Sequence, residues 1–152
     1  MSDTHSPLQT PLQTPLQAPF HLSFHVTELA ASRWFYGEIL GCPEGRSTDT
    51  WIDFDFFGNQ LSVHLGTPTP TTLTGQVDQV AVPMPHFGAV LSPERFAQIA
   101  QRLAQHPDFL LMAPMQRFEG TQGSQQTLFC KDPSGNALEF KCLQAAGALF
   151  DE

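Results

Sequence analysis

The sequence predicts an α+β domain: two βαβββ modules forming one curved, barrel-like mixed sheet with helices outside. Three observations lead to this prediction. Alternating apolar residues open a strand at Phe20, and a helical pattern follows it. A second strand and helix begin at His86, and parts of the two halves resemble each other. The 152 residues suffice for one ordinary domain, and 41% hydrophobic residues, with 13 Phe, can fill its core.

The first half reads as one strand, one helix and two further strands. Phe20–Val26 alternates apolar and polar residues, which is typical of a half-exposed strand. We expect Thr27 to cap a helix over residues 28–40 that ends at Gly41. A tight turn at Gly58-Asn59 should then join two strands, Trp51–Phe57 and Gln60–Leu65.

The second half repeats this order after a connection over residues 66–85. The connection is rich in Thr and Pro and contains one short predicted strand, Val77–Val82. Ser92 followed by Pro93 predicts the start of a helix over residues 93–105. The other predicted strands of this half are His86–Leu91, Phe109–Met115, Gln126–Lys131 and Ala137–Leu143.

Residues 1–19 repeat Pro-Leu-Gln-Thr and predict a disordered tail, followed by the domain over 20–146 and a short C-terminal tail over 147–152.

Composition and charge exclude several classes of function. A net charge of −8 argues against nucleic acid and anionic membranes as partners. We find no spanning segment or secretory signal, so we expect a cytoplasmic protein. The three cysteines form no Cys-x-x-Cys pair, which disfavours a disulfide framework or a thiolate zinc site.

The repeat aligns the chemically interesting residues of the two halves. Residues 55–64 align with residues 132–141, and residues 21–26 align with residues 86–91, at offsets of 77 and 65. With the apolar faces covered by the helices, strand parity places the alternate residues on the concave face. These are His21, Ser23, His25, Gln60, Ser62 and His64 in the first half, and His86, Gly88, Val90, Ala137, Glu139 and Lys141 in the second.

Three of these residues form a candidate metal site: His21, His86 and Glu139. Two imidazoles and a carboxylate suit Fe²⁺, Zn²⁺, Ni²⁺ or Mn²⁺, and three ligands leave positions open for a substrate. The repeat-related fourth position holds Ser62, a poor ligand. His64 is therefore either a weak fourth ligand or a general base, and Gln60 is a less suitable substitute. We expect His25 to lie in the same cavity.

The motifs over Phe20–Gly41 and Asp132–Glu139 resemble the opening and closing segments of the vicinal oxygen chelate superfamily. That superfamily includes glyoxalase I, extradiol dioxygenases, and fosfomycin and bleomycin resistance proteins. The resemblance implies that His21, His86 and Glu139 are the metal ligands, in the set associated with extradiol dioxygenases. Glyoxalase I has a fourth ligand, usually glutamate, on the strand where this chain has Ser62 and His64.

The sequence-based hypothesis is a divalent-metal-dependent enzyme, with Fe²⁺ favoured and dioxygenase-like chemistry preferred. Its substrate would be a small organic molecule chelated through two adjacent oxygens. Two alternatives stay open: a glyoxalase-type lyase or isomerase with His64 as fourth ligand, and a metal-free module that binds a drug or metabolite. The resemblance also makes a homodimer plausible.

Overall fold

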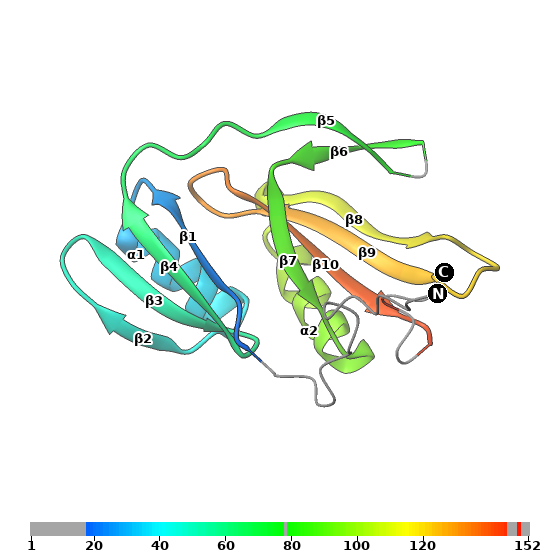
Figure 1. The fold of residues 1–152 in the computed structure, drawn as a ribbon, viewed down its shortest axis with the longest axis horizontal. Coiled ribbons are helices and arrows are strands. Elements are labelled where there is room, and N and C mark those ends of the chain that lie inside the picture. Colours follow the sequence, from blue (N-terminus) through cyan, green and yellow to red (C-terminus); the bar gives the residue numbers. More distant parts are fainter. Residues whose placement is uncertain (1–17, 78, 146–148, 150–152) are drawn as a thin grey trace, which may run out of the picture.

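The computed structural model describes residues 18–77, 79–145 and 149 (Figure 1). The predicted tails, 1–19 and 147–152, lie almost entirely outside these residues. The first module contains β1 (His21–Val26), α1 (Leu29–Ser32) with its continuation η1 (Arg33–Ile39), β2 (Glu44–Ser47), β3 (Trp51–Phe56) and β4 (Asn59–Leu65). A connection with β5 (Thr72–Val77) and β6 (Val80–Met84) follows. The second module contains β7 (His86–Val90), α2 (Pro93–Ala104), η2 (Pro107–Phe109), β8 (Leu110–Arg117), β9 (Gln125–Lys131) and β10 (Ala137–Leu143).

Each module forms a four-stranded mixed sheet with the same strand order. The orders are β1-β4-β3-β2 and β7-β10-β9-β8, and β5 pairs with β6 separately. In each module the first and last strands run parallel, with His21 opposite Gln60 in one and His86 opposite Ala137 in the other. These registers reproduce the offsets of 65 and 77 residues. The predicted α+β fold of two βαβββ modules is confirmed, without a closed barrel.

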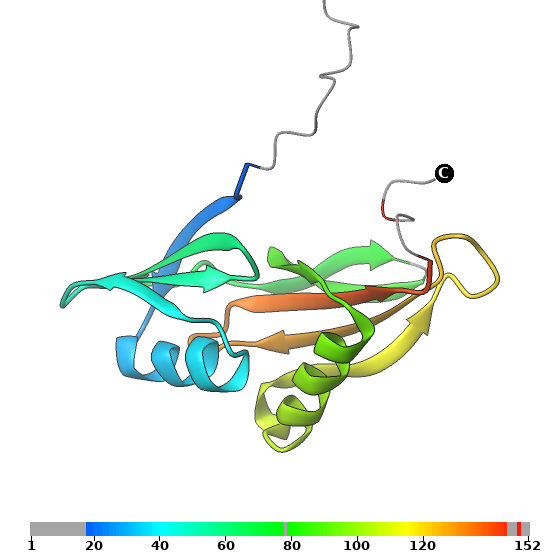
Figure 2. The same cartoon turned by 90° about the horizontal axis from the view of Figure 1, so that it is seen from below.

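The helices cover one side of both sheets, and a single hydrophobic core joins the modules. Figure 2 shows α1 and α2 on the same side of the strands. Leu22, Phe24 and Val26 pack toward this core, whereas His21, Ser23 and His25 are exposed on the opposite face. The predicted parity of β1 is therefore correct. Burial of alternating apolar residues fixes this parity, because a shift by one residue would expose all of them.

A buried hydrogen bond also ties the modules together. The hydroxyl of Tyr36, on the first helix, donates to the Asp132 carboxylate at 2.8 Å, and both residues are at most 1% exposed. Burial and the neighbouring Asp132 hold the pKa of Tyr36 well above its usual range, so the hydroxyl keeps its proton. The backbone N–H of Thr27 donates to the Ser134 hydroxyl at 2.9 Å. The turn before β10 thus contacts the end of β1 and the first helix.

The first helix differs from its prediction in two ways. Only Leu29–Ser32 is α-helical, and Arg33–Ile39 is a π-helix in which the Leu40 N–H bonds to the Phe35 carbonyl at 3.0 Å. The wider turn lets the adjacent rings of Phe35 and Tyr36 both be fully buried. Glu28 occupies the N-cap without a side-chain hydrogen bond, so the predicted cap at Thr27 is wrong. In contrast, Ser92 caps α2 as predicted, accepting from the Arg95 N–H at 3.3 Å.

Three other expectations are corrected. The turn between β3 and β4 is Phe57-Gly58, not Gly58-Asn59, with φ of 53° and 85°. The Phe57 ring packs on Phe56 and Phe140, which holds this residue in the left-handed region. The single strand predicted over 77–82 is divided between two antiparallel strands: Val77 is the last residue of β5, and Val80–Val82 belong to β6. Finally, β2 was not predicted, because its four residues are all exposed and show no apolar alternation.

Candidate functional site

His86 and Glu139 form a pair on neighbouring strands of the second sheet. His86 Nε2 lies 3.2 Å from Glu139 Oε2, and the side chains are 22% and 12% exposed. The other ring nitrogen, Nδ1, lies 2.6 Å from the Pro83 carbonyl oxygen and must therefore donate its hydrogen there. The other carboxylate oxygen, Oε1, accepts from the Thr127 hydroxyl at 2.7 Å. Both side chains are thus oriented by a second partner.

The charges of this pair stabilise each other. Burial alone would raise the pKa of Glu139, but hydrogen bonds from His86 and Thr127 and the charge of Lys141 outweigh it and lower the pKa. The hydrogen bond to Glu139 raises the pKa of His86 despite partial burial. Lys141 Nζ lies 3.6 Å from Glu139 Oε2. A cavity of about 230 Å³ opens over these residues, lined also by Gly88 and Val90.

The donor atoms of the pair fit a divalent transition metal. Two ligands at about 2.1 Å from one ion are roughly 3.0 Å apart in octahedral geometry and roughly 3.4 Å apart in tetrahedral geometry. The observed separation of 3.2 Å lies between these values. A hydrogen bond from Nδ1 to a backbone carbonyl is the usual second partner of a metal-bound imidazole. Nε2, which contacts Glu139 in this structure, would give up its hydrogen when it binds an ion.

His21, the third predicted ligand, has a different neighbour. Its Nδ1 lies 2.9 Å from Gln60 Oε1, and Gln60 Nε2 donates to Asp53 Oδ2 at 3.1 Å. Asp53 also accepts from Ser62 Oγ at 2.5 Å and from Arg46 Nη2 at 3.2 Å. Burial, which favours a raised pKa, is outweighed by these hydrogen bonds, so the pKa of Asp53 is lowered.

One chain does not bring the three predicted ligands together. His21 and His86 are the first residues of β1 and β7, and these strands cross the middle of the molecule in opposite directions (Figure 1). Within residues 18–77, 79–145 and 149, no three His, Cys, Asp or Glu side chains cluster as a metal site would require. The pair His86–Glu139 is in contact, and His21 is not part of it. The three-ligand site therefore stays a prediction.

His64 and His25 lie opposite each other on β4 and β1. They line a depression of about 400 Å³ together with Ser23, Phe24 and Thr69. The ring of His64 packs near that of Trp51, with centroids 6.2 Å apart. Trp51 is thus on the polar face of the sheet and is partly buried, whereas Phe54 and Phe56 lie in the core.

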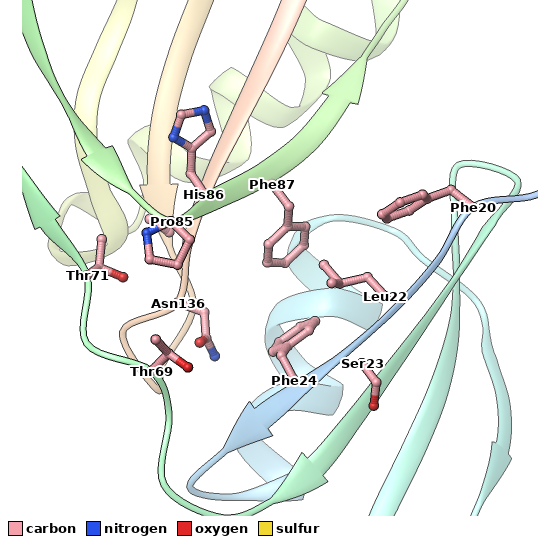
Figure 3. Close-up of a pocket in the computed structure, with 11 residues that line it drawn as sticks. Phe20, Leu22, Ser23, Phe24, Thr69, Thr71, Pro85, His86, Phe87 and Asn136 are labelled. Atoms are coloured by element: carbon pink, nitrogen blue, oxygen red, sulfur yellow. The ribbon is translucent and has the colours of Figure 1, made fainter. Parts of the chain in front are cut away.

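A separate apolar cavity of about 370 Å³ lies between β1 and β7. Phe24 and Phe87 point toward each other there, with ring centroids 5.0 Å apart, whereas the ring of His86 points away from them (Figure 3). Thr69, Thr71 and Asn136 add polar groups to its wall. The cavity combines an apolar lining with few polar groups, as small-molecule sites do.

Asp53 and Thr127 are not among the site residues that the sequence predicts. Asp53 is 7% exposed, whereas Asp55 on the same face is exposed. The strand register makes Asp53 the neighbour of Ser62 and makes Thr127 the neighbour of Lys141. Strand parity alone could have placed Asp53 on this face, but its partners depend on pairing between strands.

A model of the glyoxalase/bleomycin resistance protein/dioxygenase superfamily matches residues 19–140. The chain belongs to this superfamily. The match spans both modules and includes all three predicted ligands, which confirms the resemblance seen in the motifs at Phe20–Gly41 and Asp132–Glu139. Members of the superfamily include lyases and dioxygenases, commonly use divalent metals, bind small molecules and often form dimers.

Solved structures of this superfamily have the same fold. A glyoxalase/bleomycin resistance protein/dioxygenase from Alicyclobacillus acidocaldarius is 29% identical with a TM-score of 0.70, over 88% of this chain and 97% of that one. A fosfomycin resistance protein from Listeria monocytogenes is 15% identical with a TM-score of 0.60, over 84% and 93%. A lactoylglutathione lyase from Agrobacterium tumefaciens is 14% identical with a TM-score of 0.60, over 91% and 100%. The last two identities support the fold alone.

A search of curated proteins gave no match. Among the helices of the described residues, none combines the length and apolar character that crossing a membrane requires.

Proposed function

We propose that this superfamily member is a divalent-metal-dependent enzyme whose metal is held by His86, Glu139 and His21. The observation that carries the proposal is the His86–Glu139 pair, whose donor atoms are 3.2 Å apart. A carbonyl and a hydroxyl orient the pair, and a cavity opens over it. A purely structural ion pair would not need the cavity that opens over it.

We further propose that a second copy of the chain completes the site. In a two-fold dimer, the face of one first module can meet the face of the partner's second module, which produces two equal sites. Each site would take His21 from one copy and His86 with Glu139 from the other. Two exposed apolar residues support this arrangement. Phe20 directly precedes His21 and is 61% exposed, and Val90 lies on β7 on the same face as His86 and is 42% exposed. Dimerisation would bury them.

The substrate proposed for this site is a small organic molecule that binds the metal through two adjacent oxygens. The ion, with Fe²⁺ favoured, would act as a Lewis acid and could support dioxygenase-like chemistry. His64 is the proposed general base, because it is half-buried on the same face as His21 and lines an open depression. His25, opposite His64, would help to position the substrate.

The first test is metal binding by the wild-type protein and by Glu139→Gln. Calorimetry under anaerobic conditions with Fe²⁺, and separately with Zn²⁺, Ni²⁺ and Mn²⁺, should show one site per chain. The variant should bind at least about tenfold more weakly. Glu94→Gln, an exposed carboxylate at the start of α2, is the matched control and should bind like the wild type. Equal affinity of Glu139→Gln and wild type would refute the ligand assignment, and no binding by the wild type would favour the metal-free binding module.

The second test uses chains that are each defective in a different ligand. His21→Ala and Glu139→Gln homodimers should both bind metal poorly. After the two are unfolded and refolded together, half of the dimers are mixed, and each mixed dimer has one intact site. Binding at about one quarter of all sites should therefore return. No recovery in dimers shown to be mixed would refute a site shared between copies.

Reaction assays then separate two classes of chemistry. Oxygen consumption that depends on Fe²⁺ would support dioxygenation, and turnover of hemithioacetals with Ni²⁺ or Zn²⁺ would support the glyoxalase-type alternative.

A further inference from the structure

Asp53 is a nearly buried carboxylate on the polar face of the first sheet. It is 7% exposed and accepts hydrogen bonds from Ser62, Gln60 and Arg46. The Arg46 side chain is 80% exposed, so this contact contributes little. Ser62 and Gln60, in contrast, lie on the neighbouring strand β4, and Gln60 also contacts His21 on β1. Asp53 is therefore linked to His21 through one intervening side chain.

The directions of these hydrogen bonds follow from chemistry. An ionised carboxylate only accepts, so the amide nitrogen of Gln60 must face Asp53. The amide oxygen of Gln60 then faces His21 at 2.9 Å, and it also only accepts. The hydrogen of the neutral imidazole must therefore be on Nδ1. Nε2 of His21 then has no hydrogen and keeps its lone pair. This Nδ1–H tautomer can bind a metal ion through Nε2.

The second module holds Nδ1 of its histidine in a different way. There, His86 Nδ1 donates to the Pro83 carbonyl, and a backbone oxygen does not reverse as an amide side chain can. At the positions equivalent to Ser62 and Asp53 the second module has Glu139 and Phe129, which face each other in register as Ser62 and Asp53 do. The first module thus has its carboxylate one strand away from the position where the second module has its proposed ligand.

We propose that Asp53, acting through Gln60, is a positioning residue that holds His21 in the tautomer with a free Nε2. Asp53 fixes which end of the Gln60 amide faces His21, and Gln60 fixes which ring nitrogen has the hydrogen. This role rests on the proposed function, because it matters when His21 binds the metal. The tautomer itself, however, is a property of the metal-free protein and is measured without any ion.

The first experiment determines the tautomer of His21 by long-range ¹H–¹⁵N correlation in the metal-free, full-length protein. At about pH 8, above the usual imidazole pKa, the wild type should be mainly the Nδ1–H form. Gln60→Leu and Asp53→Ala should shift His21 toward the Nε2–H form, which an imidazole without such a partner favours in water. Asp55→Asn is the matched control, since the Asp55 carboxylate on the same strand accepts from the Gly58 N–H. This control should leave the tautomer unchanged.

A double variant tests the directions of the hydrogen bonds. In Asp53→Asn with Gln60→Glu, the new carboxylate accepts from both His21 Nδ1 and the new amide, so the Nδ1–H form should return. This rescue would not be expected if Asp53 and Gln60 served only to stabilise the sheet. Circular dichroism of each variant confirms folding, and Gln60→Leu alone decides the question for Gln60 if Asp53→Ala does not fold.

The second readout is Zn²⁺ affinity by calorimetry. Gln60→Leu and Asp53→Ala should bind 10–100-fold more weakly than the wild type, as is typical for losing a partner that orients a ligand. The double variant should recover most of this loss. A wild-type His21 in the Nε2–H form, or a tautomer unaffected by Gln60→Leu, would overturn this inference whether or not the metal binds. Failure of the wild type to bind metal would instead refute the proposed function and leave the tautomer result standing.

Discussion

Replacing Tyr36 with Phe tests how strongly the two modules are joined. The substitution removes the hydroxyl that donates to Asp132 at 2.8 Å and keeps the ring, which packs against Phe35 and Phe54 with centroids 5.2 and 5.3 Å away. No cavity larger than one oxygen atom results. The predicted change in stability is therefore the net value of one buried hydrogen bond to a carboxylate.

The environment of Asp132 sets the size of this value. Burial raises the pKa of Asp132, whereas four donors oppose that rise: the Tyr36 hydroxyl, the Asn136 side chain, and the backbone N–H groups of Ser134 and Asn136. Because all four donate, the carboxyl accepts at both oxygens and is ionised. Three donors remain after the substitution, so the loss should be near the lower end of the usual range for bonds to charged groups, about 1.5–2 kcal/mol.

Thermal and urea unfolding of the full chain measure this loss. For a domain of this size, a loss of about 2 kcal/mol lowers Tm by roughly 4–8 °C. The urea m-value should stay constant, since the core remains intact. In an Asp132→Asn background, Tyr36→Phe should cost less, because the charge-assisted bond is already gone. A Tm decrease below about 2 °C, or an equal cost in both backgrounds, would refute the idea that this bond joins the modules.

Three further predictions concern the proposed site and the buried thiols. Because the pKa of His86 is raised, its protonated form stabilises the metal-free protein fully below about pH 6.5, and this stabilisation is lost as the pH rises through the raised pKa. Because the pKa of Glu139 is lowered, its ionised form stabilises the protein above about pH 4.5, and this stabilisation is lost as the pH falls through the lowered pKa. NMR titration should therefore give His86 a pKa above its usual value, and Glu139→Gln should lower it. Gly88→Ala should destabilise the protein by about 1–3 kcal/mol in urea unfolding, because a Cβ would overlap the Glu139 backbone carbonyl; an unchanged midpoint would contradict this contact. Cys42, Cys130 and Cys142 should react slowly with Ellman's reagent at about pH 8 and fully after unfolding, since all are buried and burial raises the pKa of Cys42 to about 12. A rapid native reaction would show an accessible thiol.

The sequence predicted those features that depend on local patterns. Alternation along β1 gave the correct parity of His21 and His25, and the spacing after Ser92 gave the second helix nearly to its ends. The repeat offsets gave the register of both parallel strand pairs. In each case a buried apolar face or a cap fixes the structure through residues that are close in sequence.

Other features depend on contacts that are distant in sequence. The strand β2 is exposed throughout, so no periodicity reveals it. An α-helical pattern does not anticipate the π-helix, in which the adjacent rings of Phe35 and Tyr36 are both buried. The relative placement of β1 and β7 depends on packing at the seam, including Phe24 against Phe87. Parity placed the three predicted ligands on the polar faces of the two sheets, but it could not determine whether one chain brings them together.

The differences between the two modules also constrain how a metal site can form. Of the aligned positions on the polar faces, the imidazole is kept at His21 and His86, whereas Ser62 corresponds to Glu139 and His64 to Lys141. Two first modules facing each other would offer two imidazoles with serines in place of the carboxylate. Two second modules would offer two imidazoles and two carboxylates, each carboxylate with a lysine nearby. Of these three combinations, a first module facing a second module is the one that supplies two imidazoles with a single carboxylate. The proposed site therefore requires a first module to face a second module. Because β1 and β7 run in opposite directions within one chain, we expect these two modules to come from different copies.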